Sequence, residues 1–118
     1  MSLEGIWEPT EAVLEGNQLP EDFLYSLIFK VEGTNFSIKI GGDVDAGTIK
    51  YIPHAIPQAL ELSSTEGAHK GKIIPAIYKL TGNYLTVSIN IHGSTRPTSF
   101  ISTPENKLFT AKYTKKSS

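Results

Sequence analysis

The segment TEGAHKGKII (65–74) carries two glycines, a histidine and two lysines in the manner of a phosphate-binding loop. A Walker A loop places four residues between its first glycine and the Gly-Lys pair, and follows the lysine with Ser or Thr for magnesium. Here Gly67 and Gly71-Lys72 enclose only three residues, and Ile73 follows. No helical pattern continues from the segment to present an N-terminus to a phosphate. We therefore interpret it as a turn between strands whose glycines supply positive φ.

A second segment, GGDVDAG (41–47), begins like a calcium loop because Asp43 and Asp45 alternate along it. The EF-hand form requires glycine at the sixth position and glutamate at the twelfth. Those positions hold Thr48 and His54. The pattern favours a polar turn over a calcium site.

The three histidines, His54, His69 and His92, show neither HxH nor HExxH spacing, and the chain has no cysteine to complete a zinc site. No GxSxG stretch marks a serine nucleophile. Pairs of carboxylates are present, as expected for a chain with 12 acidic residues, but none shows the spacing of an acid–base catalytic site. We expect no metal, no cofactor and no enzymatic activity.

The bulk composition excludes several classes of partner. The 118 residues are one domain by size, 1–118, and the net charge is −1 with a pI near 6.3. Nucleic acids and anionic membranes both require a basic face, so neither is expected as a partner. No apolar run approaches the roughly 18 residues of a membrane span, and no charged and then apolar leader opens the chain. We expect a soluble, cytoplasmic protein.

The elements that must position these residues are short strands. In FLYSLIFKV (23–31) and YLTVSINI (84–91) apolar and polar residues alternate, which is typical of half-buried strands. Glycine, asparagine and proline separate such runs at short intervals. The expected strands are 4–16, 23–32, 35–41, 46–53, 57–63, 72–81, 84–92 and 107–114, with an extra short one at 98–102. Helix is expected only as a single turn within 20–26.

The first strand has a defect in its alternation. Trp7 lies in one phase, Ala12 and Leu14 lie in the other, and Pro9 stands between them. Proline cannot donate a hydrogen bond to a ladder, so a bulge or bend at this point would reconcile the two phases. Bends of this kind help a sheet to close on itself.

Five segments in order along the chain resemble a known pattern: LEGIW (3–7), LPED (19–22), TEGAHKGK (65–72), IYKLTGNYL (77–85) and RPTSF (96–100). The sequence is similar to a lipocalin-like domain family of planctomycete bacteria. The resemblance implies an all-β fold, an antiparallel up-and-down β-barrel of the lipocalin (calycin-like) kind. With the strand pattern, this gives a barrel of eight to ten strands. The resemblance implies no catalytic residue.

The order of up and down strands divides the connections between two ends. Trp7, the tryptophan that in lipocalins plugs the closed end of the barrel, lies with the short hairpins at 33–35 and 82–83. Lipocalins stack an arginine on this tryptophan, but strand parity places Arg96 at the opposite end. The longer loops there predict a mouth with the polar residues Arg96, His92, Lys70, His69 and Glu66. The predicted interior contains Tyr25, Phe29, Tyr51, Leu85, Val87 and Ile89.

One open mouth indicates a binding protein for a small hydrophobic or amphipathic molecule. An apolar bore beneath Arg96 suits a ligand with an acidic head, because guanidinium pairs with carboxylate in a two-pronged geometry. The other interpretation of Arg96 is that it ties its loop to Glu66 or to backbone carbonyls. The alternative function is a ligand-free protein-interaction or regulatory module, since an eight-stranded barrel can also be filled by its own side chains.

Overall fold

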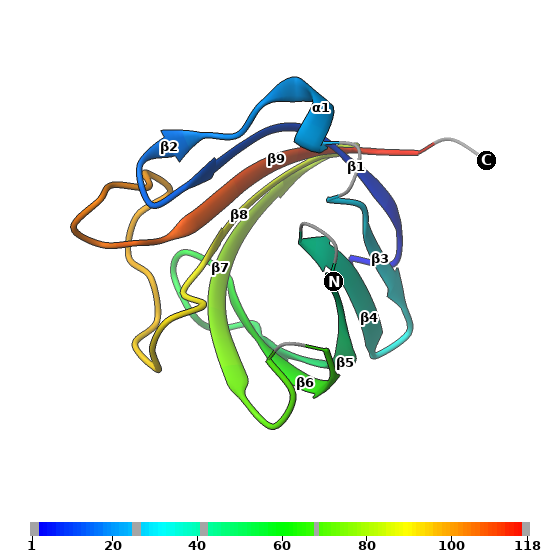
Figure 1. Cartoon of the computed structure of the whole chain (residues 1–118). Coiled ribbons are helices and arrows are strands. Elements are labelled where there is room, and N and C mark those ends of the chain that lie inside the picture. The colour runs from blue at the N-terminus through cyan, green and yellow to red at the C-terminus, as the bar shows by residue number, and fades with distance from the viewer. Residues whose placement is uncertain (1–2, 25–26, 41–42, 68, 117–118) are drawn as a thin grey trace.

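The computed structural model describes residues 3–24, 27–40, 43–67 and 69–116. Strands make up almost all of its regular structure, arranged as a ring around one core (Figure 1). In chain order the elements are β1 (Gly5–Leu14), β2 (Asn17–Gln18), α1 (Glu21–Leu24), β3 (Phe29–Glu32), β4 (Asn35–Ile40), β5 (Asp43–Ile52), β6 (Ala59–Glu66), β7 (Ile73–Thr81), β8 (Tyr84–Ile89) and β9 (Phe109–Lys115).

The strands form a closed antiparallel barrel. From β3 to β9 each strand pairs with the next, and β1 pairs with both β3 and β9, so the sheet closes on itself. The two-residue strand β2 is appended to the far end of β1. The predicted up-and-down β-barrel is confirmed, and α1 is the single helical turn that the sequence predicts within 20–26.

The start of one predicted strand and one predicted extra strand are wrong. The run 23–32 becomes a strand only from Phe29, because α1 occupies 21–24; Phe23 therefore packs on the core from a helix. Tyr25, predicted for the interior, lies outside the described residues. The stretch 98–102 contains no strand and belongs to the irregular segment between β8 and β9.

The predicted polar turn at 41–47 is also wrong over its described part. Residues 43–47 belong to β5, which pairs with β4 from Ile40↔Asp43 onward. Asp45 is only 3% exposed. A buried carboxylate in a strand requires hydrogen-bond donors around it, and the turn between β6 and β7 supplies them.

The predicted bulge in β1 is confirmed. The register between β1 and β9 shifts between Pro9 and Glu11, because β1 has one extra residue there relative to β9. Trp7 and Ala12, five positions apart and in opposite phases of a regular strand, are both buried as a result. The shift bends the strand where the barrel closes.

Trp7, predicted to plug the closed end of the barrel, has a buried side chain. Its indole nitrogen donates a hydrogen bond to the carbonyl of Leu3 at 2.7 Å, and the Leu3 amide donates to the Tyr51 hydroxyl at 3.0 Å. The cation near the indole is Lys115, whose ammonium lies 5.9 Å from the ring centroid. Arg96 lies in the segment that joins β8 to β9, at the opposite end of these strands.

The interior of the barrel is filled by side chains. Phe29, Leu85, Val87 and Ile89 are each at most 5% exposed, and Tyr51 is partly buried against the same core. The cavity that remains among them has a volume of about 10 Å³. Its walls are Phe29, Ile38, Leu60, Leu62, Ala76, Ile77, Tyr78, Val87, Ile89 and Tyr113. This is about the space of one water molecule.

One polar atom in this interior stands out. The Tyr113 hydroxyl is buried and has no hydrogen-bond partner among the described residues. Burial raises the pKa of Tyr113 above its ordinary value of 10.0. Burial, and then the neighbouring Tyr51, also raise the pKa of Tyr78. Both shifts follow from the loss of water around a phenol that would have to carry charge.

Candidate binding groove beside the first strand

The turn between β6 and β7 is fastened to β5 by a histidine. The amide of His69 donates to one oxygen of Asp45 at 3.0 Å, and its Nδ1 lies 2.8 Å from the other. At Gly67, where φ is +100°, a side chain would collide with the backbone of Val44 and with Asp45. Only glycine fits this close approach. The segment 65–72 is thus a strand connection, as the sequence predicts.

Ser64 lies beside this histidine and aspartate, but the hydrogen bonds among the three residues differ from those of a catalytic triad. A catalytic triad requires the serine to bond the imidazole nitrogen that faces away from the aspartate. Here Ser64 Oγ donates to the Glu66 carbonyl at 3.0 Å and lies 3.5 Å from Asp45 Oδ1. The serine is therefore bound to the acid and the backbone, and the arrangement fastens the turn.

A second histidine–carboxylate pair fastens the β8–β9 segment. His92 Nε2 lies 2.8 Å from Glu15 Oε2, at the turn that follows β1. The Asn90 side chain accepts hydrogen bonds from the amides of His92 and Gly93 and donates one to the carbonyl of Thr95. This pair is exposed, whereas Asp45 in the other pair is buried.

None of the cavities found among the described residues is lined by more than one of the predicted mouth residues. His69 and His92 are each held by a different carboxylate, whereas Arg96, Lys70 and Glu66 are exposed and take part in no ion pair among the described residues. The β8–β9 segment, coloured gold to orange in Figure 1, lies outside the ring of strands. Within the described residues, no group of three potential metal ligands occurs.

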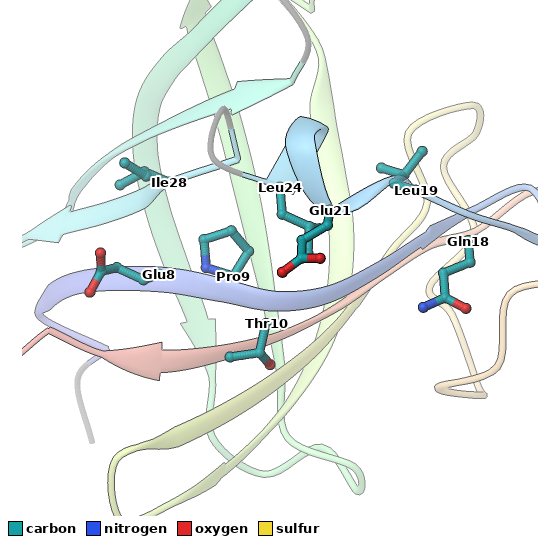
Figure 2. A pocket seen from close by; sticks show the side chains of 8 residues that line it. All are labelled: Glu8, Pro9, Thr10, Gln18, Leu19, Glu21, Leu24 and Ile28. Carbon is teal, nitrogen blue, oxygen red and sulfur yellow. The ribbon is translucent and has the colours of Figure 1, made fainter.

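A groove lies instead on the outer side of β1, with a volume of about 400 Å³ (Figure 2). It is open to solvent along one side and lies between β1 and the segment that carries α1. Its walls are Glu8, Pro9, Thr10, Gln18, Leu19, Glu21, Leu24 and Ile28.

The groove lies where β1, on one edge, stops pairing with β3 and has not yet begun to pair with β2. On this edge β1 pairs with β3 only as far as Trp7 and with β2 only from Val13. The Leu19 amide bonds the Ala12 carbonyl at 2.9 Å and starts the crossing toward α1. Among the described residues, residues 8–11 of β1 therefore have no strand beside them on this edge, and the segment that carries α1 lines a hollow there.

The walls of the groove are amphipathic. Pro9, Leu19, Leu24 and Ile28 supply apolar surface, Thr10 and Gln18 supply hydrogen-bonding groups, and Glu8 and Glu21 supply carboxylates. Figure 2 shows Glu21 directed from α1 toward β1, with Glu8 on the other side of the Pro9 ring in this view.

Sequence reasoning missed this site. The sequence pattern predicts a single strand over 23–32, which leaves no gap beside β1. The available signal was Pro9, because a proline within a strand marks a place where the ladder on one side is interrupted.

Comparison with protein-family models, with curated proteins and with solved structures gives no match for this chain. Within the described residues, no helix is long and apolar enough to cross a membrane. What the structure itself defines is a closed antiparallel β-barrel with a filled interior and an amphipathic groove on its outer side.

Proposed function

We propose that the protein binds a small amphipathic molecule in the groove between β1 and α1 and does not alter it chemically. The observation that carries this proposal is the contrast in volume between two hollows of the barrel. The groove, at about 400 Å³, is within the usual range of ligand pockets, whereas the cavity among the described residues of the interior, at about 10 Å³, has about the space of one water molecule.

The resemblance to lipocalin-like domains supports a binding function but not the location that those barrels suggest. A ligand with an apolar body and an acidic head beneath Arg96 would need space among Val87, Ile89 and their neighbours. Those side chains are packed together. The apolar body therefore has room beside Pro9 and Leu24, on the outer side.

Binding without catalysis is supported by the arrangement of Ser64, His69 and Asp45. Their hydrogen bonds join the serine to the acid and the backbone, which leaves the hydroxyl without a base. Among the described residues of the groove walls there is no histidine, lysine or cysteine that would act as a base or nucleophile.

A protein-interaction module is the second candidate, favoured by the open edge of β1 at residues 8–11. An extended peptide can add a strand to such an edge. Pro9 offers no N–H to a new strand, and the register shift beside it twists the edge away from regular pairing. These two features favour a small molecule over a peptide.

An NMR titration tests the proposal. Three octyl compounds with different heads, octanol, octylammonium and octanoate, are added to ¹⁵N-labelled protein. At least one should cause saturable shifts of the Thr10, Leu19 and Leu24 amides and leave those of Val87 and Ile89 in place. Leu24→Ser should weaken this binding by about tenfold, because it removes most of an apolar contact.

The matched control is Ile101→Ser, which removes an equally apolar side chain that is 69% exposed and lies outside the groove. It should leave the affinity unchanged. Shifts centred on Val87 and Ile89 would move the site into the barrel, and no saturable shift with any of the three compounds would overturn the proposal.

A further inference from the structure

The charge of the groove walls is one-sided. Among the described residues that line it, two are glutamates, Glu8 and Glu21, and none is lysine, arginine or histidine. The chain as a whole is nearly balanced, with 11 basic and 12 acidic side chains, so an acidic lining is not a general property of its surface. The groove is locally negative within a neutral protein.

The two carboxylates are available to a ligand. The ion pairs among the described residues join His69 to Asp45, His92 to Glu15 and Lys112 to Glu11, and include neither Glu8 nor Glu21. Glu21 is also in the first turn of α1, and in Figure 2 its carboxylate is directed into the groove rather than along the helix. The four-residue helix is too short to neutralise it.

Apolar surface lies between the two carboxylates. In Figure 2 the Pro9 ring lies between Glu8 and Glu21, and the Leu24 side chain extends from α1 beside Glu21. A ligand that fits these walls has an aliphatic body for Pro9, Leu19 and Leu24 and a positively charged head for a carboxylate. An anionic head would face repulsion from both glutamates.

We infer that the groove selects a cationic amphiphile, an aliphatic chain that carries an ammonium group held by Glu21 and Glu8. This inference rests on the proposed function, since it names the ligand class of the same groove. The inferred head group is positively charged, whereas Arg96 at the predicted mouth of the barrel suggests an acidic head group.

The test compares dissociation constants for octylammonium, octanol and octanoate, measured from the Thr10 and Leu24 amide shifts. Octylammonium should bind at least about threefold more tightly than octanol, and octanoate more weakly than either, which is the range that exposed ion pairs support. Raising the ionic strength from about 0.01 M to about 0.15 M shortens the Debye length from about 30 Å to about 8 Å. That change should remove most of the advantage of octylammonium and leave the binding of octanol in place.

Two variants and a control locate the effect. Glu21→Gln and Glu8→Gln should each reduce the affinity for octylammonium by about two- to threefold and leave that for octanol unchanged. Glu105→Gln, in the exposed turn before β9, removes the same charge from the protein outside the groove and should change neither affinity. Both groove glutamates are exposed, so far-UV circular dichroism of the variants should match the native protein.

Each outcome has a defined meaning. If octanol binds the groove as tightly as octylammonium and the two glutamine variants change nothing, the cationic head is wrong and the groove remains a site for neutral amphiphiles. Tighter binding of octanoate would overturn the inference in the same way. If none of the three compounds shifts the groove amides, the proposed function itself fails.

Discussion

The barrel interior and the outer groove share strand β1 yet differ in every physical respect. Toward the interior β1 contributes Trp7 and Ala12, which are 2% and 0% exposed, and the space around them is packed. Along the groove it contributes Glu8, Pro9 and Thr10, which face solvent and a hollow of about 400 Å³. In this barrel the larger hollow lies where the hydrogen-bonded ladder of β1 is interrupted, and the described interior is packed.

The reason is geometric. A barrel of eight strands is just wide enough for its own side chains, and it holds a ligand only when the inward residues are small. Here the inward residues include Phe29, Tyr78, Phe36 and Tyr113, which are all 4% exposed or less. These rings occupy the volume that a ligand would need.

Truncating Trp7 gives the strongest test of the contrast between a packed interior and an open groove. Trp7→Ala should lower the free energy of unfolding by about 3–5 kcal/mol, because it leaves a large cavity at the closed end and removes the hydrogen bond to Leu3. Urea denaturation followed by far-UV circular dichroism measures the loss. Tyr84→Ala, at a side chain 67% exposed on the outer face, should change stability by less than about 1 kcal/mol. A similar small change for Trp7→Ala would show that the interior is not packed as described.

The second test adds volume to the interior. Ala76 lines the remaining cavity and is 2% exposed, so Ala76→Leu should lower the free energy of unfolding by about 1–3 kcal/mol through overpacking. Gln18→Leu adds apolar volume to the groove wall instead, and should stay within about 0.5 kcal/mol of the native protein. A neutral or stabilising effect of Ala76→Leu would mean that the barrel holds ligand-sized space after all.

The smallest expected effect comes from removing one oxygen. Tyr113→Phe should raise the free energy of unfolding by about 1 kcal/mol, because the buried hydroxyl has no partner among the described residues. Burial raises the pKa of Tyr113 in the folded state, so its contribution is constant below the unfolded value of about 10 and stability is lost as pH rises above it.

Denaturation curves at neutral pH and above pH 10 measure both parts of this prediction. The variant should be more stable at neutral pH and should lose less stability in alkali than the native protein. The control is Tyr84→Phe, at an exposed ring. A net loss of stability for Tyr113→Phe at neutral pH would indicate that the hydroxyl is hydrogen-bonded within the barrel.

Much of the fold follows from local patterns in the sequence. Alternation along 84–91 places Leu85, Val87 and Ile89 in the core because successive side chains of a strand point to opposite faces. The phase change between Trp7 and Ala12 predicts the register shift that β1 shows at Pro9. The count of up and down strands also assigns Trp7 and Arg96 to opposite ends.

Local patterns fail where long-range contacts decide. The sequence pattern predicts Asp45 as a turn residue, because an isolated carboxylate is usually exposed to water. Asp45 is instead buried in β5, because His69, 24 positions later in the chain, forms a hydrogen bond with its carboxylate. Phe23 belongs to a run that alternates like a strand, yet it lies in α1, and β3 pairs with β1 only as far as Trp7.

The sequence alone determined that the chain forms short antiparallel strands, that Trp7 belongs to their core and that β1 bends at Pro9, since each depends on residues close together in the chain. The barrel is what the family resemblance implies, and its closure joins β1 to β9 from distant parts of the chain. Only the tertiary structure decided that the interior is full and that Glu8, Leu24 and Glu21 line one groove. The volume of the interior and the set of residues that line the groove depend on how distant segments of the chain pack. The spacing of residues within a single strand does not predict either of them.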